Sequence, residues 1–208
     1  MLIKSLLGAV ATFALASAAQ AVNVSVWTNQ PASVTQNATI AQAAGLGAPN
    51  VTTTVAGIAF TTNNSDATTV GEWLGNPPLS STLVDNSYML FTGTIFLTAG
   101  DNFFTIQHDD GLQLSLDGGI GLVVNVPGPT PPVTTPFDIV APSTGNFNFT
   151  MSYGECCDGP AVLSWRYPTG APVGDLPEPA TWAMMLLGFG GIGIALRRRK
   201  QDVAPKMA

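Results

Sequence analysis

Apolar and polar residues alternate along several short stretches of this chain, and this alternation restricts the fold more than any other feature. Residues 146–153, "NFNFTMSY", and residues 112–116, "LQLSL", change character at every position. Side chains of a β-strand point to opposite faces in turn, so each stretch predicts a strand with one buried face. No long stretch repeats apolar residues at the period of a helix. Many short strands separated by Gly, Pro and Asn predict an all-β fold, an antiparallel sandwich or barrel.

The rest of the central region is less uniform. Residues 89–111, "MLFTGTIFLTAGDNFFTIQHDDG", predict two strands joined by a turn at 99–102, and residues 161–167, "AVLSWRY", predict one more strand. The prolines of "NVPGPTPPVTTP", residues 125–136, exclude a central strand and indicate a long exposed loop. Residues 23–70 are rich in Thr, Asn and Ala, and they leave open early strands, long loops and partial disorder.

The N-terminal residues 1–21 have the pattern of a secretory signal peptide. Lys4 precedes an apolar run at 6–16, and the small residues Ala19 and Ala21 follow it. A charged start, an apolar middle and a small-residue exit predict cleavage after Ala21 and export of the chain. The alternative is a buried N-terminal helix.

The C-terminal region contains a second apolar segment. Residues 180–196 carry no charge and are followed at once by Arg197, Arg198, Arg199 and Lys200. This length is at the short end of what spans a hydrocarbon core of ~30 Å, and the basic residues favour a cytoplasmic end. The pattern predicts one transmembrane helix, with the preceding domain on the non-cytoplasmic side of the membrane. The alternative is an apolar core helix.

The tripeptide Pro177-Glu178-Pro179, followed by the apolar segment and the arginines, resembles the PEP-CTERM sorting signal of exported bacterial proteins. The resemblance covers residues 177–200, and the tail at 201–208 is longer than such signals usually have. It implies an exosortase, a membrane protease that cuts near the tripeptide, as a partner. It also implies transient membrane anchoring before delivery to the cell surface or an extracellular polysaccharide matrix.

The region between the two terminal segments, residues 22–176, is strongly acidic. It contains eleven Asp and Glu residues and a single cation, Arg166. Nucleic-acid binding needs Lys and Arg to neutralise phosphates, so this region is predicted not to bind nucleic acid. An acidic surface suits a hard cation, which takes carboxylate and carbonyl oxygens.

Two segments of this region resemble the protective-antigen sugar-binding module, a β-sandwich found in adhesins, flocculins and glycosidases. The first is "TIQHDDGLQLSLDGG", residues 105–119, in which a strand, an Asp-Asp-Gly, an alternating strand and an Asp-Gly turn follow one another. The second is "APSTGNFNFTMSYGECCDGPAVLSW", residues 141–165, which is similar to the later strand pair of the module. The resemblance covers roughly residues 88–167, and it implies an antiparallel β-sandwich.

The resemblance also implies a binding site. In sugar-binding members the paired aspartates, here Asp109 and Asp110, bind calcium, and the ion chelates vicinal hydroxyls of a sugar. Calcium takes several oxygens at ~2.3–2.6 Å, which adjacent carboxylates can supply. The loop "GECCDGP" would supply the second side of the site, with Asp158 as the candidate ligand and Glu155 behind it. Relatives more often use an asparagine and backbone carbonyls there. The alternative is an ordinary hairpin turn that binds no ion.

Cys156 and Cys157 are adjacent and are the only cysteines. Export into oxidising surroundings favours a disulfide between them, which would stiffen the loop beside the calcium site. Intermolecular pairing and a metal site are the alternatives, although two thiolates and one distant histidine fall short of a zinc site.

Four further residues complete the candidates. His108 is the only histidine and is predicted to be a strand residue at the edge of the glycan site, because no Ser, His and Asp arrangement can be built around it. Trp27 and Trp73 are candidate sugar-stacking platforms, whereas Trp165 lies in an alternating strand and is predicted to be core.

Together these patterns predict an exported, non-catalytic surface or matrix protein whose sandwich binds carbohydrate through calcium. The predicted glycan contacts are made by six residues: His108, Asp109, Asp110, Cys156, Cys157 and Asp158. A purely structural matrix protein is the alternative. A glycosidase using Asp109 with Glu155 or Asp158 is a third hypothesis, and it requires two carboxylates ~5–10 Å apart across a cleft.

Overall fold

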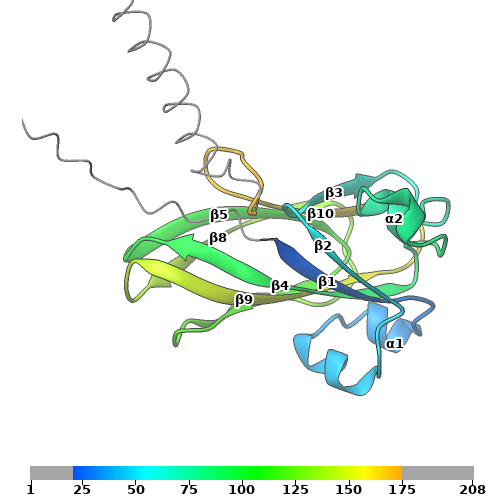
Figure 1. Ribbon diagram of the computed structural model, residues 1–208, viewed down its shortest axis with the longest axis horizontal. Helices are drawn as coiled ribbons and strands as arrows, with labels where there is room; N and C mark the ends of the chain where they lie inside the picture. Colours follow the sequence, from blue (N-terminus) through cyan, green and yellow to red (C-terminus); the bar gives the residue numbers. More distant parts are fainter. Residues whose placement is uncertain (1–20, 175–208) are drawn as a thin grey trace, which may run out of the picture. The chain divides into compact units, whose positions relative to one another are not determined.

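A computed structural model describes residues 21–174 of the chain, and within this part ten strands form two antiparallel sheets (Figure 1). The six-stranded sheet has the order β2-β1-β4-β9-β6-β7, and the four-stranded sheet has the order β3-β10-β5-β8. The strands are β1 (Val22–Trp27), β2 (Val51–Val55), β3 (Ala59–Thr62), β4 (Ser87–Leu97), β5 (Gly100–Asp109), β6 (Leu112–Leu116), β7 (Gly121–Val126), β8 (Val133–Ala141), β9 (Gly145–Glu155) and β10 (Ala161–Arg166). The predicted signal peptide, sorting signal and transmembrane segment lie outside the described residues.

The predicted β-sandwich is confirmed, and the alternation of the sequence explains it. The longest pairing joins β4 to β9 and runs from Ser87 opposite Glu155 to Leu97 opposite Gly145. The apolar residues of the alternating stretch in β9 are all buried against the second sheet, and they are Phe147, Phe149, Met151 and Tyr153.

Aromatic side chains fill much of the space between the sheets. Trp165 of β10 is fully buried, and its ring meets the ring of Phe149 edge-on at a centroid distance of 5.1 Å. Its prediction as a core residue is confirmed. Trp27 and Trp73 are also buried, at 6% and 4% exposure, so the prediction that they are sugar-stacking platforms is wrong. Their indole N–H groups donate to the carbonyl oxygens of Gly47 (3.0 Å) and Ala161 (3.2 Å), which satisfies the one polar atom of each ring.

The N-terminal third, which the sequence left open, is ordered and divides between strands and short helices. The helices of the described residues are α1 (Ala32–Thr35), η1 (Ile40–Gly45), α2 (Val70–Trp73) and η2 (Pro77–Leu79). The segment with α1 and η1 packs against β9 of the six-stranded sheet. There the Ser152 hydroxyl donates a hydrogen bond to the Ala38 carbonyl at 2.6 Å. α2 begins with a capping box between Thr69 and Glu72.

The predicted loop over residues 125–136 is wrong at both ends. Asn125 belongs to β7, and β8 begins at Val133, so the loop is limited to residues 127–132. Pro136 lies inside β8, opposite Thr105 of β5. A proline cannot donate a hydrogen bond to a neighbouring strand, and β8 accommodates it because β8 is an edge strand with a partner on one side only.

The predicted turn at 99–102 is displaced. β4 ends at Leu97 and β5 begins at Gly100, so Asp101 and Asn102 belong to β5. Gly100 adopts a φ of 91°, which allows the chain to turn directly into the new strand.

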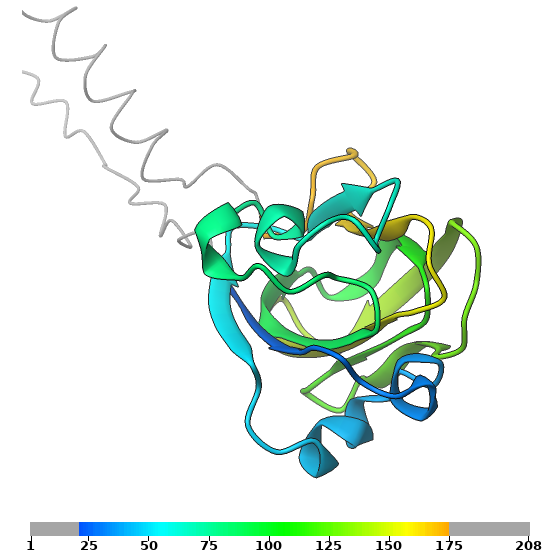
Figure 2. The same ribbon diagram turned by 90° about the vertical axis from the view of Figure 1, so that its right-hand side faces the viewer.

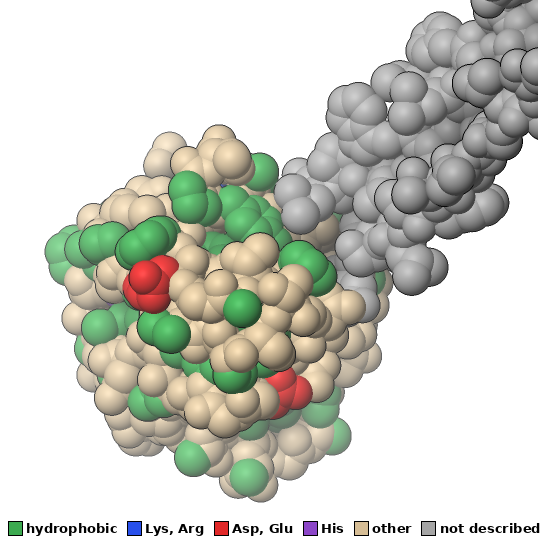
Figure 3. Space-filling view, turned by 90° about the vertical axis from the view of Figure 1, so that its left-hand side faces the viewer, with side chains coloured by type: hydrophobic (Ala, Val, Ile, Leu, Met, Phe, Trp, Pro, Cys, Tyr) green, Lys and Arg blue, Asp and Glu red, His purple; other side chains and the backbone are tan. Residues whose placement is uncertain are grey.

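Charged side chains are sparse on the surface. Arg166 is the single Lys or Arg of the described part, and its Nη1 donates to the Gly170 carbonyl at 2.8 Å. Figure 3 shows a face on which uncharged side chains dominate and two acidic groups lie apart from each other. Within residues 21–174 the structure therefore presents no basic patch.

Between residues 21 and 174 no helix has the length and apolar character needed to cross a bilayer.

Candidate functional site

The Asp109-Asp110 pair lies at the end of the sandwich where β5 and β9 finish and β4 begins; Figure 2 is turned toward this end. Asp109 is the last residue of β5, and β6 starts two residues after Asp110. The peptide bond between the two aspartates is cis. Both side chains are largely buried, with exposures of 6% and 4%.

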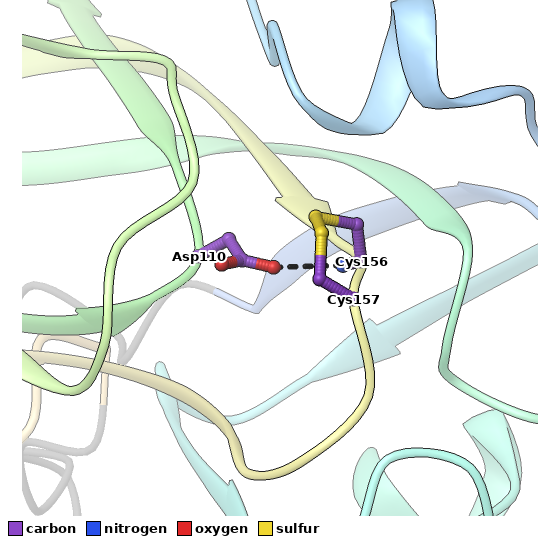
Figure 4. Close-up of side chains that lie close together, drawn as sticks. All are labelled: Asp110, Cys156 and Cys157. Carbon is purple, nitrogen blue, oxygen red and sulfur yellow. Dashed lines mark hydrogen bonds between the residues drawn. A yellow bond between two sulfur atoms is a disulfide. The ribbon is translucent and has the colours of Figure 1, made fainter.

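The Asp110 carboxylate connects two loops. Its Oδ2 accepts the backbone N–H of Cys156 at 2.8 Å, and its Oδ1 accepts the backbone N–H of Thr130 at 3.2 Å. Figure 4 shows the carboxylate directed at the Cys156–Cys157 segment. The aspartate thereby holds the loop after β7 and the loop after β9 together.

Gly111 allows the β7–β8 loop to pack against the aspartate pair. A Cβ at this position would lie 2.2 Å from the Pro127 carbonyl oxygen and 2.6 Å from that of Gly128. The Gly111 carbonyl also accepts the N–H of Gly154 in β9 at 3.0 Å. The glycine is therefore required by close backbone approach on the loop side.

His108 is a buried, neutral strand residue. Its Nδ1 lies 2.6 Å from the Asp110 carbonyl oxygen, which can only accept, so Nδ1 carries the proton. The Thr135 hydroxyl lies 3.1 Å from Nε2. Burial lowers the pKa of His108. The hydrogen bond to the Asp110 backbone and the charge of Asp110 raise it to a smaller extent. Its exposure of 1% places the ring beneath the site, where it supports the Asp110 backbone.

Tyr153 and Glu155 form a buried pair beneath Asp109. The Tyr153 hydroxyl contacts both the Asp109 carbonyl oxygen and Glu155 Oε2, the latter at 2.5 Å. A phenol has one proton and the Asp109 carbonyl can only accept, so a protonated Glu155 supplies the second hydrogen bond. Burial raises the pKa of Glu155 to about 9, in agreement with a neutral acid.

The carboxyl groups of the site repel one another. Burial, followed by the charge of Asp110, raises the pKa of Asp109 to about 6. Burial also raises the pKa of Asp110 and of Asp85, and Asp85 contributes its charge to the shift of Asp110. Among the described residues the one cationic side chain, Arg166, is bound to Gly170 instead. Negative charge at this end therefore has no protein counter-ion in residues 21–174.

A disulfide joins Cys156 to Cys157, whose Cα atoms are 3.7 Å apart. Cys156 is buried and Cys157 is exposed. One carboxylate oxygen of Asp110 and the two sulfur atoms lie within 4.8 Å of one another (Figure 4). The Gln36 amide donates to Cys157 Sγ at 3.3 Å, so the α1 segment reaches the rim of the site.

The predicted site residues thus divide into two groups. His108, Asp109, Asp110, Cys156 and Cys157 come together. The exposed Asp158 lies beside Asp85. Burial raises the pKa of Asp85, the Asp158 backbone N–H lowers it, and the Asp158 charge raises it, so the two residues are neighbours.

Sequence reasoning missed Gln36, Asp85 and Tyr153. Tyr153 belongs to the alternating stretch and so was assigned to the core alone, whereas Gln36 and Asp85 lie far from the motif in sequence and carried no signal.

The residues present fit a hard cation. Calcium takes oxygen ligands, and the Asp109 and Asp110 side chains offer four carboxylate oxygens in one place. The carboxylate of Asp110 keeps lone pairs beyond those used by two backbone N–H groups. Burial and, after it, the charge of Asp110 raise the pKa of Asp109, and a divalent ion here would neutralise the repulsion between the two carboxylates.

Comparisons with known proteins bear on the fold and on the C-terminal region of the chain. The sequence model of the PEP-CTERM protein-sorting motif matches residues 175–200. Among solved structures, the PA14 sugar-binding domain from an RTX adhesin is similar with a TM-score of 0.52 and 17% identity, over 74% of this chain and 93% of that one. The PA14 domain of the MpAFP antifreeze protein is similar with a TM-score of 0.56 and 18% identity, over 74% of this chain and 84% of that one. No curated protein sequence matches the chain.

The fold and the matched motif define the class of the chain. It is a β-sandwich with the fold of PA14 domains, also called protective-antigen modules. Its C-terminal region carries a PEP-CTERM sorting signal, the mark of an exported protein. Both predicted resemblances are confirmed.

Proposed function

We propose that this chain is an exported, non-catalytic carbohydrate-binding protein whose Asp109 and Asp110 side chains hold calcium. The observation that carries the proposal is the contact between two buried carboxyl groups that no described cation neutralises. This pair lies in a fold shared with a PA14 domain that is described as sugar-binding. When bound, calcium would supply coordination of adjacent sugar hydroxyls, and the two aspartates would hold it at the end of the sandwich.

The remaining parts of the site have supporting roles in this proposal. Cys156 presents its backbone N–H to Asp110, and His108 fixes the Asp110 carbonyl from below. The exposed Cys157 lies at the rim of the site, and Asp158, the next residue of the same exposed loop, is a candidate for a further calcium or sugar contact.

The sorting signal supports delivery to the cell surface. An exosortase would cut near Pro177-Glu178-Pro179, and Arg197, Arg198 and Arg199 would keep the end of the chain on the cytoplasmic side until then. The glycan partner is then a polysaccharide of the surface or matrix.

The glycosidase hypothesis is weakened by the position of Glu155. Its side chain is fully buried and bound to Tyr153, so it cannot act on a substrate together with Asp109. Asp158, the other carboxyl group that this hypothesis would pair with Asp109, lies on an exposed loop beside Asp85.

A purely structural role is the second candidate, and the hydrogen bonds of Asp110 favour it. Both of its oxygens accept backbone N–H groups, which alone explains why an aspartate stands there. In this case the pair would fasten two loops and bind no sugar.

A glycan array separates the two candidates. The oxidised domain, residues 22–176, contains every described strand and the whole described core. We expect it to bind a subset of glycans in millimolar calcium and to lose this binding in chelator. The double variant Asp109→Asn with Asp110→Asn should bind none. Equal binding with calcium and with chelator, or no binding by the wild type, would support the structural role.

A further inference from the structure

Behind the aspartate pair lies a group of buried polar atoms that have no hydrogen-bond partner. Four side-chain atoms of the described residues share this property here: Ser65 Oγ, Asp85 Oδ1, Ser87 Oγ and Glu155 Oε1. The residues Ser65, Ser87 and Glu155 are fully buried, at 0% exposure.

Backbone contacts bring these four residues together. Ser87 is paired with Glu155 across β4 and β9, so their side chains project from the same face of the sheet. Burial raises the pKa of Glu155, and the Ser65 hydroxyl lies close enough to the carboxyl group to offset part of this rise, so the two groups are neighbours. The Asp85 N–H donates to the Ser65 carbonyl at 3.3 Å. The four residues are therefore neighbours, and we call the place where they meet the Glu155 pocket.

Buried polar groups nearly always have a partner in folded proteins, whether a protein atom, an ordered water or an ion. Several unpartnered atoms at one place indicate a small polar occupant. All four are oxygens, two of them from carboxyl groups, and the charges of Asp109 and Asp110 add to the negative potential at Glu155. Oxygen donors in a negative potential select a hard cation over an anion.

We propose that the Glu155 pocket binds a divalent hard cation of the calcium class, with Glu155 and Ser87 as ligands and Ser65 and Asp85 beside them. Glu155, which is a neutral acid without the ion, releases its proton to solvent when the ion binds. This internal site is distinct from the site at Asp109 and Asp110. The proposal does not depend on whether the chain binds sugar. Its ion ties β4, β9 and the loop at Ser65 together at the base of the aspartate pair.

The test is the effect of Ser87→Ala on melting temperature, measured in millimolar calcium and in chelator with the oxidised domain, residues 22–176. In chelator the variant removes an unpartnered hydroxyl, so its melting temperature should equal or exceed that of the wild type. In calcium the variant loses a ligand, so its melting temperature should fall below that of the wild type. Ser164→Ala is the matched control, because Ser164 Oγ is also buried and unpartnered but lies in β10 of the other sheet. Its effect should have the same sign in both conditions.

Equilibrium dialysis then counts the bound ions. In the background of Asp109→Asn with Asp110→Asn, we expect one calcium per chain, which Ser87→Ala removes. A pocket that holds water only would give no calcium in this background and the same sign for Ser87→Ala in both conditions, which would overturn the proposal. The Asp109-Asp110 site is judged separately, by the difference in ion count between this background and the wild type.

Discussion

In chelator, the domain should lose stability as the pH rises from 7 to 9, and Glu155→Gln should remove most of this loss. The pKa of Glu155 is about 9 in the folded protein and near 4.5 when unfolded, because folding buries the carboxyl group. Between these values the folded state binds one proton more than the unfolded state. The free energy of unfolding therefore falls with rising pH, by at most about 1.4 kcal/mol per pH unit for one proton.

The interval from pH 7 to 9 isolates this group. The pKa of Asp109 is about 6, so Asp109 has largely ionised at the lower end. The lowered pKa of His108 costs stability only as the pH falls below about 6.5. Glutamine has the size of glutamate and keeps an N–H that can donate to the Tyr153 oxygen, but it does not titrate.

Thermal melts of the wild type and Glu155→Gln at pH 7, 8 and 9 provide the measurement. Glu72→Gln is the control, because the exposed Glu72 has a lowered pKa and is ionised in both states throughout this interval. Its slope should match the wild type. Parallel slopes for the wild type and Glu155→Gln would show that Glu155 is not a neutral acid in the folded protein.

Gly111→Ala should destabilise the domain and weaken the calcium site at the same time. The new Cβ would lie 2.2 Å from the Pro127 carbonyl oxygen, a backbone atom that cannot move alone. Displacing residues 127–132 would also pull the Thr130 N–H away from Asp110 Oδ1. Overpacking of this kind costs ~1–3 kcal/mol, and the loss of a hydrogen bond to a charged group adds to it.

Gly128→Ala is the matched control for this substitution. Gly128 lies in the same loop, a Cβ there would meet no atom within 4 Å, and its φ is not positive. Urea unfolding should give Gly111→Ala a midpoint well below that of the wild type and leave Gly128→Ala within experimental error of it. Equal midpoints for the two variants would contradict the close packing of Gly111 against the loop.

The sequence predicted the sandwich because alternation is a local property of each strand. The alternating pattern of residues 146–153 predicts a strand with one buried face, and the apolar residues of this stretch are buried in β9. Trp27 and Trp73 were misassigned because an isolated tryptophan gives no sign of which side of a sheet it faces. Pro136 was misread because edge and central strands differ only in their neighbours, which are distant in sequence.

The candidate site shows the same division. Asp109 and Asp110 were found because they form one contiguous motif that resembles a known module. The Glu155 pocket could not be predicted from the sequence. Ser65, Asp85 and Ser87 belong to no recognisable motif, and only the fold brings their segments to Glu155. Sorting was predictable from the C-terminal residues alone, since a sorting signal is read as a linear sequence.

The central claim, that Asp109 and Asp110 hold calcium, is tested most directly by melting curves of the wild type and of Asp109→Asn with Asp110→Asn. An ion that binds only the folded state stabilises it, by about 2.7 kcal/mol when its concentration is 100 times its Kd. We predict that millimolar calcium raises the melting temperature of the wild type more than that of the double variant. In chelator the melting temperature of the wild type should not exceed that of the double variant, because the two carboxylates of the wild type repel each other. An equal rise in both proteins, or no rise in the wild type, would contradict the claim.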